Sequence, residues 1–325
     1  MSRIGPVVFV LAFASACSSS SDKPDSPHGE IFATHAVQGL GSMVSDGNAI
    51  YFGSGGALTK VAFSDKTVTT LAEFHDNEGP WGSSSVAVDE KQVYFCASTS
   101  GYVVGRIAKG GGQVETVLAP PEPGFIAASV TVDEQAVYVA HQNGDGSGDV
   151  FRFDTATLEP TIWPSPSVPV ASLADAHAFY WGDAGGVLHK HSKVDGTETI
   201  AQTARSGYPL YLAQDAAYLY AYDPSLGLRR IAKDTGTTSA IAVDQGNNLS
   251  EARELAVDET YVYWSTVSEK VFRVPIAGGA VERLAEPAQP VPFEKEGLGG
   301  YGLVIHEGYI YWYAYSEGAI RRVAR

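Results

Sequence analysis

The segment from Asn143 to Asp149 carries side chains suited to binding a metal ion. Asn143, Asp145, Ser147 and Asp149 place oxygen atoms at alternate positions among three glycines, and this spacing is typical of a calcium-binding loop. The flanking segments, however, are short and apolar, which predicts two strands of one hairpin rather than the helices that flank such a loop. A Gly-rich turn is therefore the favoured interpretation, calcium is the alternative, and no other cofactor is expected.

Two further patterns resemble binding motifs only in part. The segment 297–302, GLGGYG, has the glycine spacing of a dinucleotide-binding turn, but an apolar strand follows it and no helix is predicted to receive a pyrophosphate. His189 and His191 share one face of a predicted strand, as two metal ligands could, but no third ligand is evident. We expect a loop at the first pattern and no zinc site at the second.

Nine aromatic, histidine and arginine residues stand between the apolar strands, in segments predicted to be loops, and they follow no repeated pattern. Aromatic side chains on variable loops suit a flat ligand such as a sugar or a peptide side chain. The alternative is that some of them cap the hydrophobic core. The nine residues are His75, Trp81, Phe125, Trp163, Arg205, Tyr208, Arg253, Phe293 and Tyr301.

A repeat that runs through the chain positions these residues. The copy from Leu255 to Pro287 holds an apolar strand ending in Asp, a turn, a strand built on Val262-Tyr263-Trp264, a strand with a central basic residue, a Gly-Gly turn and a last strand. Seven copies, with centres 39 to 48 residues apart, predict an all-β, seven-bladed β-propeller. The central residues are Tyr51, Tyr94, Tyr138, Tyr180, Leu219, Tyr263 and Tyr311.

Two polar positions recur in the copies, and repetition favours a structural role for both. An acidic position ends the first strand, where a carboxylate can accept backbone N–H groups of a turn; it is occupied by Asp46, Asp89, Asp133, Asp175, Gln214, Asp258 and His306. A basic position lies in the third strand, at Lys60, Arg106, Arg152, His189, Arg230, Arg273 and Arg322. A catalytic group is needed once, whereas a bond between blades is needed in every blade.

The two ends of the chain predict that the repeats close into a ring. The last copy stops after its third strand, which ends at Val323, and lacks the outer strand of the others. The segment 29–34 matches the missing strand in polarity and in its position before the next copy. An N-terminal outer strand that completes the last blade would leave no free sheet edge.

The first 29 residues are predicted to serve export and anchoring. Residues 1–16 combine a basic start, an apolar run too short to span a membrane and a small-residue cleavage site, which is typical of a signal peptide. Cys17 follows directly, as in a bacterial lipoprotein signal, although Ala14 stands where Leu is preferred and the ordinary signal peptidase could also cut here. The segment 17–29 is then a lipidated Cys and a flexible tether, and 30–325 is the propeller.

From residue 30 to residue 325 the chain resembles bacterial β-propeller lipoproteins with VDxxxVYW repeats, and more distantly the YWTD and NHL propellers. The resemblance rests on Val257-Asp258, Val262-Tyr263-Trp264 and Gly278-Gly279; it is partial, since Ser265-Thr266 stands where YWTD repeats have Thr-Asp. It implies a binding or scaffold module, although some propellers, such as the streptogramin lyases, are enzymes. A lipoprotein with Ser18 after the Cys is expected at the outer membrane.

Charge narrows the partners that the chain can bind. With 37 acidic and 22 basic residues, the formal net charge is −15, so a nucleic acid is not expected as a ligand. We expect a cell-envelope lipoprotein that attaches to the membrane through Cys17 and binds a glycan or an envelope protein at the mouth of the channel. A lyase or hydrolase that uses His75, His141 or Arg205 on the same face is the alternative, and binding is favoured over catalysis.

Overall fold

The structure is a computed structural model of the 325-residue chain. It describes residues 26–34, 40–54, 56–74, 85–99, 101–118, 126–143, 145–165, 167–194, 196, 198–202, 211–223, 227–242, 252–289, 291 and 302–325. In this part of the chain, no helix is long and apolar enough to cross a membrane.

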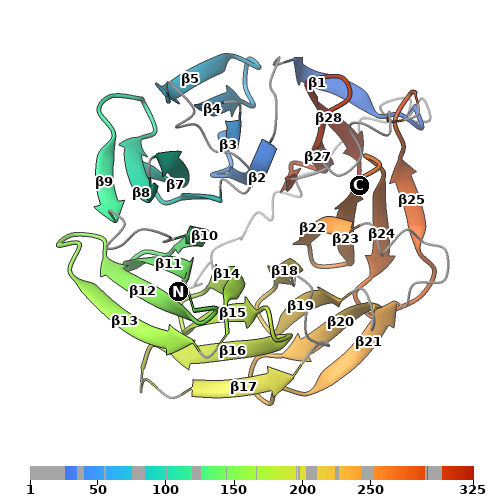
Figure 1. Cartoon of the computed structure of the whole chain (residues 1–325). Coiled ribbons are helices and arrows are strands. Elements are labelled where there is room, and N and C mark those ends of the chain that lie inside the picture. Colours follow the sequence, from blue (N-terminus) through green and yellow to red (C-terminus); the bar gives the residue numbers. More distant parts are fainter. Residues whose placement is uncertain are drawn as a thin grey trace, which may run out of the picture.

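The strands form seven antiparallel four-stranded sheets that are arranged as blades around a central axis (Figure 1). This confirms the all-β, seven-bladed propeller. From the innermost strand outwards, the first three blades are β2 (Leu40–Ser45), β3 (Ala49–Ser54), β4 (Ala57–Ala62) and β5 (Val68–Glu73); β6 (Val86–Val88), β7 (Gln92–Thr99), β8 (Gly101–Ala108) and β9 (Glu115–Leu118); and β10 (Ile126–Val132), β11 (Ala136–Gln142), β12 (Gly148–Asp154) and β13 (Pro160–Ser165).

The remaining four blades continue round the ring in the order of the chain. They are β14 (Pro169–Ala174), β15 (Ala178–Asp183), β16 (Val187–Ser192) and β17 (Glu198–Gln202); β18 (Tyr211–Gln214), β19 (Tyr218–Asp223), β20 (Gly227–Ala232) and β21 (Thr238–Ala242); β22 (Ala252–Val257), β23 (Tyr261–Thr266), β24 (Val271–Pro275) and β25 (Glu282–Ala285); and β26 (Leu303–His306), β27 (Tyr309–Ala314), β28 (Ala319–Ala324) and β1 (Glu30–Thr34).

The N-terminal strand β1 closes the ring, as predicted from the two chain ends. It pairs antiparallel with β28 as the outer strand of the seventh blade, with Glu30 opposite Arg322 and Thr34 opposite Ala319. Just before this strand, Gly29 has a φ of +63° and its Cα lies so close to the Trp312 ring that a Cβ would be 2.5 Å from it. Only glycine fits this entry to the closing strand.

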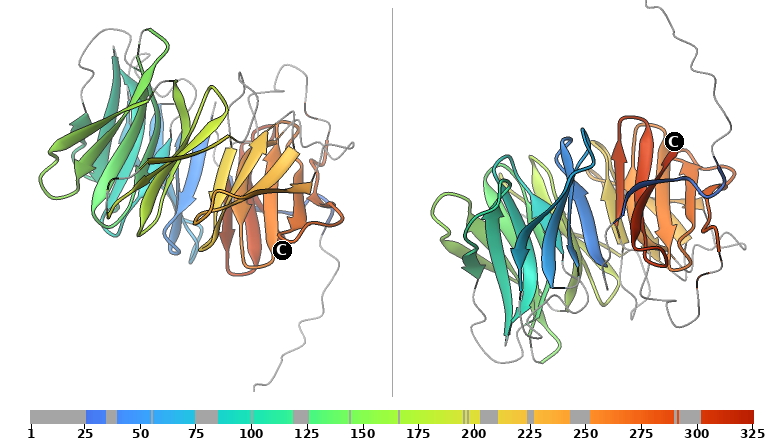
Figure 2. Two further views of the ribbon diagram at one scale, coloured as in Figure 1. Left: turned by 90° about the horizontal axis from the view of Figure 1, so that it is seen from below. Right: turned by 90° about the horizontal axis from the view of Figure 1, so that it is seen from above.

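The core lies between neighbouring blades, which stack face to face (Figure 2). The second strand of each blade packs against a neighbour on both faces, so its side chains are apolar on both faces, as predicted. All six residues of β15 are buried, and Trp181, Trp264 and Trp312 are each at most 1% exposed. Cys96 in β7 is a buried free thiol, in agreement with its expected role as a small hydrophobe.

The acidic position builds the same turn in six blades, which confirms its structural role. In blade 1, Asp46 Oδ1 accepts the N–H groups of Asn48 and Ala49 at 2.9 and 3.0 Å, and its Oδ2 accepts the Tyr51 hydroxyl at 3.0 Å. The assignment of Gln214 to this position is wrong by one residue, because Asp215 accepts the corresponding N–H groups and the Tyr220 hydroxyl. The turn is built on Asp46, Asp89, Asp133, Asp175, Asp215 and Asp258.

The basic position lies opposite the central tyrosine and joins blades, as predicted. Lys60 donates to the backbone carbonyl of Lys109 in the next blade at 3.3 Å, and Arg106 donates to that of Thr155 at 3.4 Å. In blade 4 the residue opposite Tyr180 is Lys190, so the placement of His189 in this set is wrong by one residue. The strand register therefore puts the His189 side chain on the other face of the blade.

Candidate functional site

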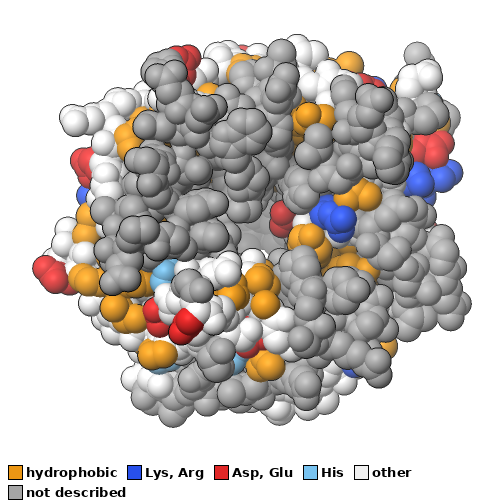
Figure 3. All heavy atoms as spheres, viewed as in Figure 1, with side chains coloured by type: hydrophobic (Ala, Val, Ile, Leu, Met, Phe, Trp, Pro, Cys, Tyr) orange, Lys and Arg blue, Asp and Glu red, His pale blue; other side chains and the backbone are white. Residues whose placement is uncertain are grey.

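Most of the predicted channel-mouth residues lie outside the described residues, so their role stays a prediction. This holds for His75, Trp81, Phe125, Arg205, Tyr208, Phe293 and Tyr301, and also for the lipidation residue Cys17. Figure 3 shows the face of the ring seen in Figure 1, where acidic, histidine and hydrophobic side chains gather over the blades of β12 and β15.

Two of the nine predicted residues are described, and only Arg253 lies close to the predicted place. Arg253 is the second residue of the innermost strand β22 and donates to the carbonyl of Ala252 at 2.9 Å. Trp163 was expected in a loop that enters an inner strand, and this placement is wrong. It lies in the outermost strand β13 and stacks on His191 of the next blade, with ring centroids 3.8 Å apart. Trp163 therefore packs blade 3 against blade 4.

The predicted Gly-rich turn joins β11 to β12, which confirms the hairpin. Within it, Asn143 Nδ2 donates to Ser147 Oγ and to Asp149 Oδ2 at 3.0 and 3.1 Å, and Ser147 N donates to Asp145 Oδ1 at 2.9 Å. The oxygen-bearing side chains thus bond to one another. Across the described residues, no group of three or more His, Cys, Asp or Glu side chains is arranged to hold a metal ion, and calcium stays an untested alternative.

His141 and His189 each lie beside a carboxylate, and both histidines are buried. His189 Nε2 is 2.9 Å from Asp183 Oδ2, both side chains are 2% exposed, and the imidazole stacks on the Trp181 ring. His141 Nδ1 is 3.9 Å from Asp149 Oδ2, and burial lowers the pKa of this histidine. Because both imidazoles are covered, they serve packing better than general acid–base catalysis.

One carboxyl group on an innermost strand, that of Glu254, was not among the residues predicted from the sequence. Glu254 in β22 pairs with Ser265, at the position where blades 1, 2 and 3 have Ser42, Ser85 and Ser129. Those hydroxyls bond to the next innermost strand, as when Ser42 Oγ accepts the N–H of Val86 at 3.0 Å. Burial raises the pKa of Glu254 to about 8. The signal that could have found it is a charged residue where blades 1, 2 and 3 have serine.

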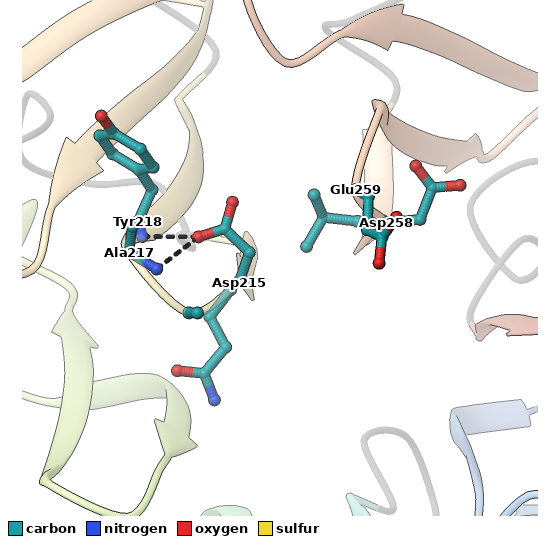
Figure 4. Close-up of a pocket in the computed structure, with 8 residues that line it drawn as sticks. Asp215, Ala217, Tyr218, Asp258 and Glu259 are labelled. Carbon is teal, nitrogen blue, oxygen red and sulfur yellow. Dashed lines mark hydrogen bonds between the residues drawn. The ribbon is translucent and has the colours of Figure 1, made fainter. Parts of the chain in front are cut away.

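A second candidate site is a cleft between blades 5 and 6, on the side of the ring where the first strand of each blade turns into the second (Figure 4). Asp215 lies on one side of the cleft and Asp258 with Glu259 on the other. The cleft has a volume of about 460 Å³ and is lined by Gln214, Asp215, Ala216, Ala217, Tyr218, Val257, Asp258 and Glu259. Arg325 already pairs with Asp258, so the carboxylates that favour a cationic ligand here are those of Asp215 and Glu259.

No known family model matches the chain, and no curated protein matches it in sequence. Solved structures share its fold. BamB from Moraxella catarrhalis is 15% identical, over 91% of this chain and 83% of that chain, with a TM-score of 0.56. The Pan2 WD40 domain of Neurospora crassa is 8% identical, over 92% and 96% of the two chains, with a TM-score of 0.67. A chain of the mitotic checkpoint complex is 9% identical, over 99% of each chain, with a TM-score of 0.71. At these identities, the likeness extends to the propeller fold alone.

Proposed function

We propose that this protein is a lipid-anchored β-propeller of the bacterial cell envelope that binds an envelope protein or a glycan at the mouth of its channel. One observation carries the proposal: the charged residues that recur in the blades are engaged in turns and in bonds between blades. The residues left for a ligand are those that differ from blade to blade, and seven of the nine predicted ones stand in the sequence between the strands. Variable loops on a rigid scaffold are a common arrangement for binding.

The position of the N-terminus supports the anchoring part of the proposal. The described chain begins at Ser26, and Glu286, just after the outer strand β25, donates its N–H to the carbonyl of Pro27 at 2.9 Å. An anchor on Cys17 would therefore be tied to the perimeter of the ring.

The anchor is tested by Cys17→Ala. Acyl chains contribute about 0.8 kcal/mol per buried methylene, so two or more chains hold a protein on a membrane where one is marginal. We expect the wild type in the membrane fraction with a lipid mass on Cys17, and the variant in the soluble fraction of the envelope. A wild type that is equally soluble and carries no lipid would remove the anchor from the proposal.

The binding face is tested by comparing two tryptophans. Trp81→Ala should keep the melting temperature and lose binding to a glycan array or to an immobilised envelope extract, because a ligand-stacking side chain contributes little to folding. Trp163→Ala is the matched control: its ring packs against His191 and Phe179, so its loss should lower the melting temperature. If Trp81→Ala destabilises the protein as strongly as the control, Trp81 is part of the core.

The alternative of a lyase or hydrolase gains no support from the described histidines, because His141 and His189 are buried. It rests on His75 and Arg205, which lie outside the described residues.

A further inference from the structure

In four pairs of neighbouring blades, a cation of the following blade bonds to the turn aspartate of the preceding blade. Lys109 Nζ lies 2.7 Å from Asp46 Oδ2, and Lys233 Nζ lies 2.8 Å from Asp175 Oδ2. Burial alone would raise the pKa of Asp46, but Lys109, the turn N–H groups and Tyr51 lower it to about 2. The other two pairs are Lys193 with Asp133 and Arg325 with Asp258.

Lys233 shows what surrounds the ammonium group in such a pair. Besides Asp175 Oδ2, its Nζ donates to the backbone carbonyl of Asp215 at 2.7 Å and to Gln214 Oε1 at 2.9 Å. It also lies over the Tyr180 ring, 5.3 Å from the centroid. The arrangement provides three oxygen acceptors for the three N–H donors and an aromatic face for the charge.

Between blades 5 and 6 the turn aspartate is kept and the cation is replaced, and Val257 stands at the position that Gln214 holds in blade 5. Ile276 stands three residues after Arg273, the basic residue of blade 6, just as Lys233 stands three residues after Arg230 in blade 5 and Lys109 three residues after Arg106 in blade 2. Asp215 nevertheless has the usual geometry, because its Oδ1 accepts two turn N–H groups at 2.7 Å and its Oδ2 accepts the Tyr220 hydroxyl at 2.6 Å.

Arg230 does not substitute for the replaced cation. Its NH1 donates to the backbone carbonyl of Ile276 at 3.3 Å. Lys190 makes the equivalent bond to the carbonyl of Lys233 at 2.6 Å, and that pair of blades has its Lys–Asp ion pair as well. The basic residue of the third strand and the cation three residues after it therefore occupy different places. In blade 6 it is this later cation that is replaced by Ile276.

The cleft of about 460 Å³ opens at this pair of blades, with Asp215 on one side and Asp258 and Glu259 on the other. We propose that this cleft binds a lysine side chain of a partner protein, whose ammonium group bonds to Asp215 Oδ2 as Lys233 bonds to Asp175. Lysine is favoured because three of the four internal cations are lysines. A protein with exposed lysines also suits the net charge of −15.

The probe is the peptide acetyl-Gly-Lys-Gly-amide, titrated into the full mature chain and followed by NMR, with the Nε-acetyl-lysine peptide as the uncharged control. Removing a charge-assisted hydrogen bond costs about 1.5–3 kcal/mol, so Asp215→Asn should weaken binding about 10- to 100-fold. Asp89→Asn is the matched variant, because Asp89 builds the same turn and Thr155 stands at the position of the cation in the blade that follows. It should leave binding unchanged, and equal losses in both variants would overturn the proposal.

A second pair of variants introduces a lysine at the position where blades 6 and 3 lack the cation. Ile276→Lys should bond to Asp215, raise the melting temperature and abolish peptide binding, whereas Thr155→Lys should raise the melting temperature and leave binding intact. Peptide binding by Ile276→Lys at wild-type affinity, or equal binding of the acetylated peptide by the wild type, would contradict the assignment. This cleft lies at the turns that follow the innermost strands β18 and β22, whereas the predicted mouth residue Trp81 precedes the innermost strand β6 in the sequence. Trp81→Ala should therefore bind the peptide normally, and the two proposals fail separately.

Discussion

Glu254 and His189 each stand at a position that other blades fill with a different kind of residue. Glu254 takes a place held by serine in blades 1 to 3, and His189 lies one residue before the basic position and pairs with Asp183. The residue type alone does not show which face of the blade such a side chain occupies, because a Glu or His in a strand is compatible with either face. Their environment follows from register, which the strand pairing supplies.

The raised pKa of Glu254 leads to a pH-dependent prediction. Its pKa is about 8 in the folded chain, whereas an unperturbed Glu, as in the unfolded chain, has a pKa of 4.5. The folded state therefore binds the proton more tightly than the unfolded state. The resulting stabilisation is complete below pH 4.5 and is lost as the pH rises through 8. Glu254→Gln, which stays neutral, should therefore raise the melting temperature at pH 9 more than at pH 5.

The prediction is checked by thermal unfolding of both proteins at the two pH values. Glu259→Gln is a suitable control, because Glu259 is an exposed residue of the turn after β22. It should shift the melting temperature little at either pH. A shift for Glu254→Gln that does not depend on pH would show that the carboxyl group is already ionised and solvated.

At the scale of elements, the sequence pattern predicts the strands well and their register less well. The copy Tyr218-Leu219-Tyr220 has an aromatic residue on each side of its centre, so the pattern fits equally when it is shifted by one residue. The structure selects Tyr220 as the central residue, and Asp215 then stands five residues before it. The Asp–Tyr hydrogen bond is a pairwise constraint that a count of apolar residues does not contain.

The sequence pattern also misplaced Trp163, which lies in a strand and not in a loop. The segment 160–165, PTIWPS, contains two prolines, and Trp163 within it was expected in a loop. Proline is tolerated on an edge strand, where its missing N–H breaks no ladder bond, and β13 is the outermost strand of its blade. The connecting segments, which carry most of the predicted mouth residues, have no periodicity at all, so their geometry could not be predicted from a repeat.

At the scale of the whole molecule, the number of blades and the closure of the ring could be predicted because both follow from counting. Seven copies and one missing outer strand leave one consistent arrangement, in which β1 joins β28. The contacts between blades could not be predicted in the same way. Whether a blade pair contains an ion pair, as at Asp175, or a cleft, as at Asp215, depends on single residues three positions after the repeated basic residue.

Ring closure can be tested by truncation from the N-terminus. Arg321 NH1 donates to the carbonyl of Gly29 at 3.1 Å and also to that of His28, and residues 27–28 contact Glu286. The ordered contacts of the chain therefore begin before β1. Deleting residues 18–25 should leave the melting temperature nearly unchanged, because this removes only the predicted tether. Deleting residues 18–36 should lower it sharply, because it exposes the edge of β28 and uncovers the buried side chains that pack on Phe32.

The longer deletion should also change the association state of the protein. An unpaired β28 offers free N–H and C=O groups to another chain, so this variant should aggregate or associate further at concentrations where the shorter deletion keeps the association state of the wild type, as measured by light scattering. Ile31→Ala in the full mature chain is the matched control: Ile31 belongs to β1, its side chain is 48% exposed, and the substitution leaves the strand backbone in place. Two truncated proteins of equal stability and equal association state would mean that β1 is dispensable, and the ring would then have to be held closed by contacts between blades 7 and 1 alone.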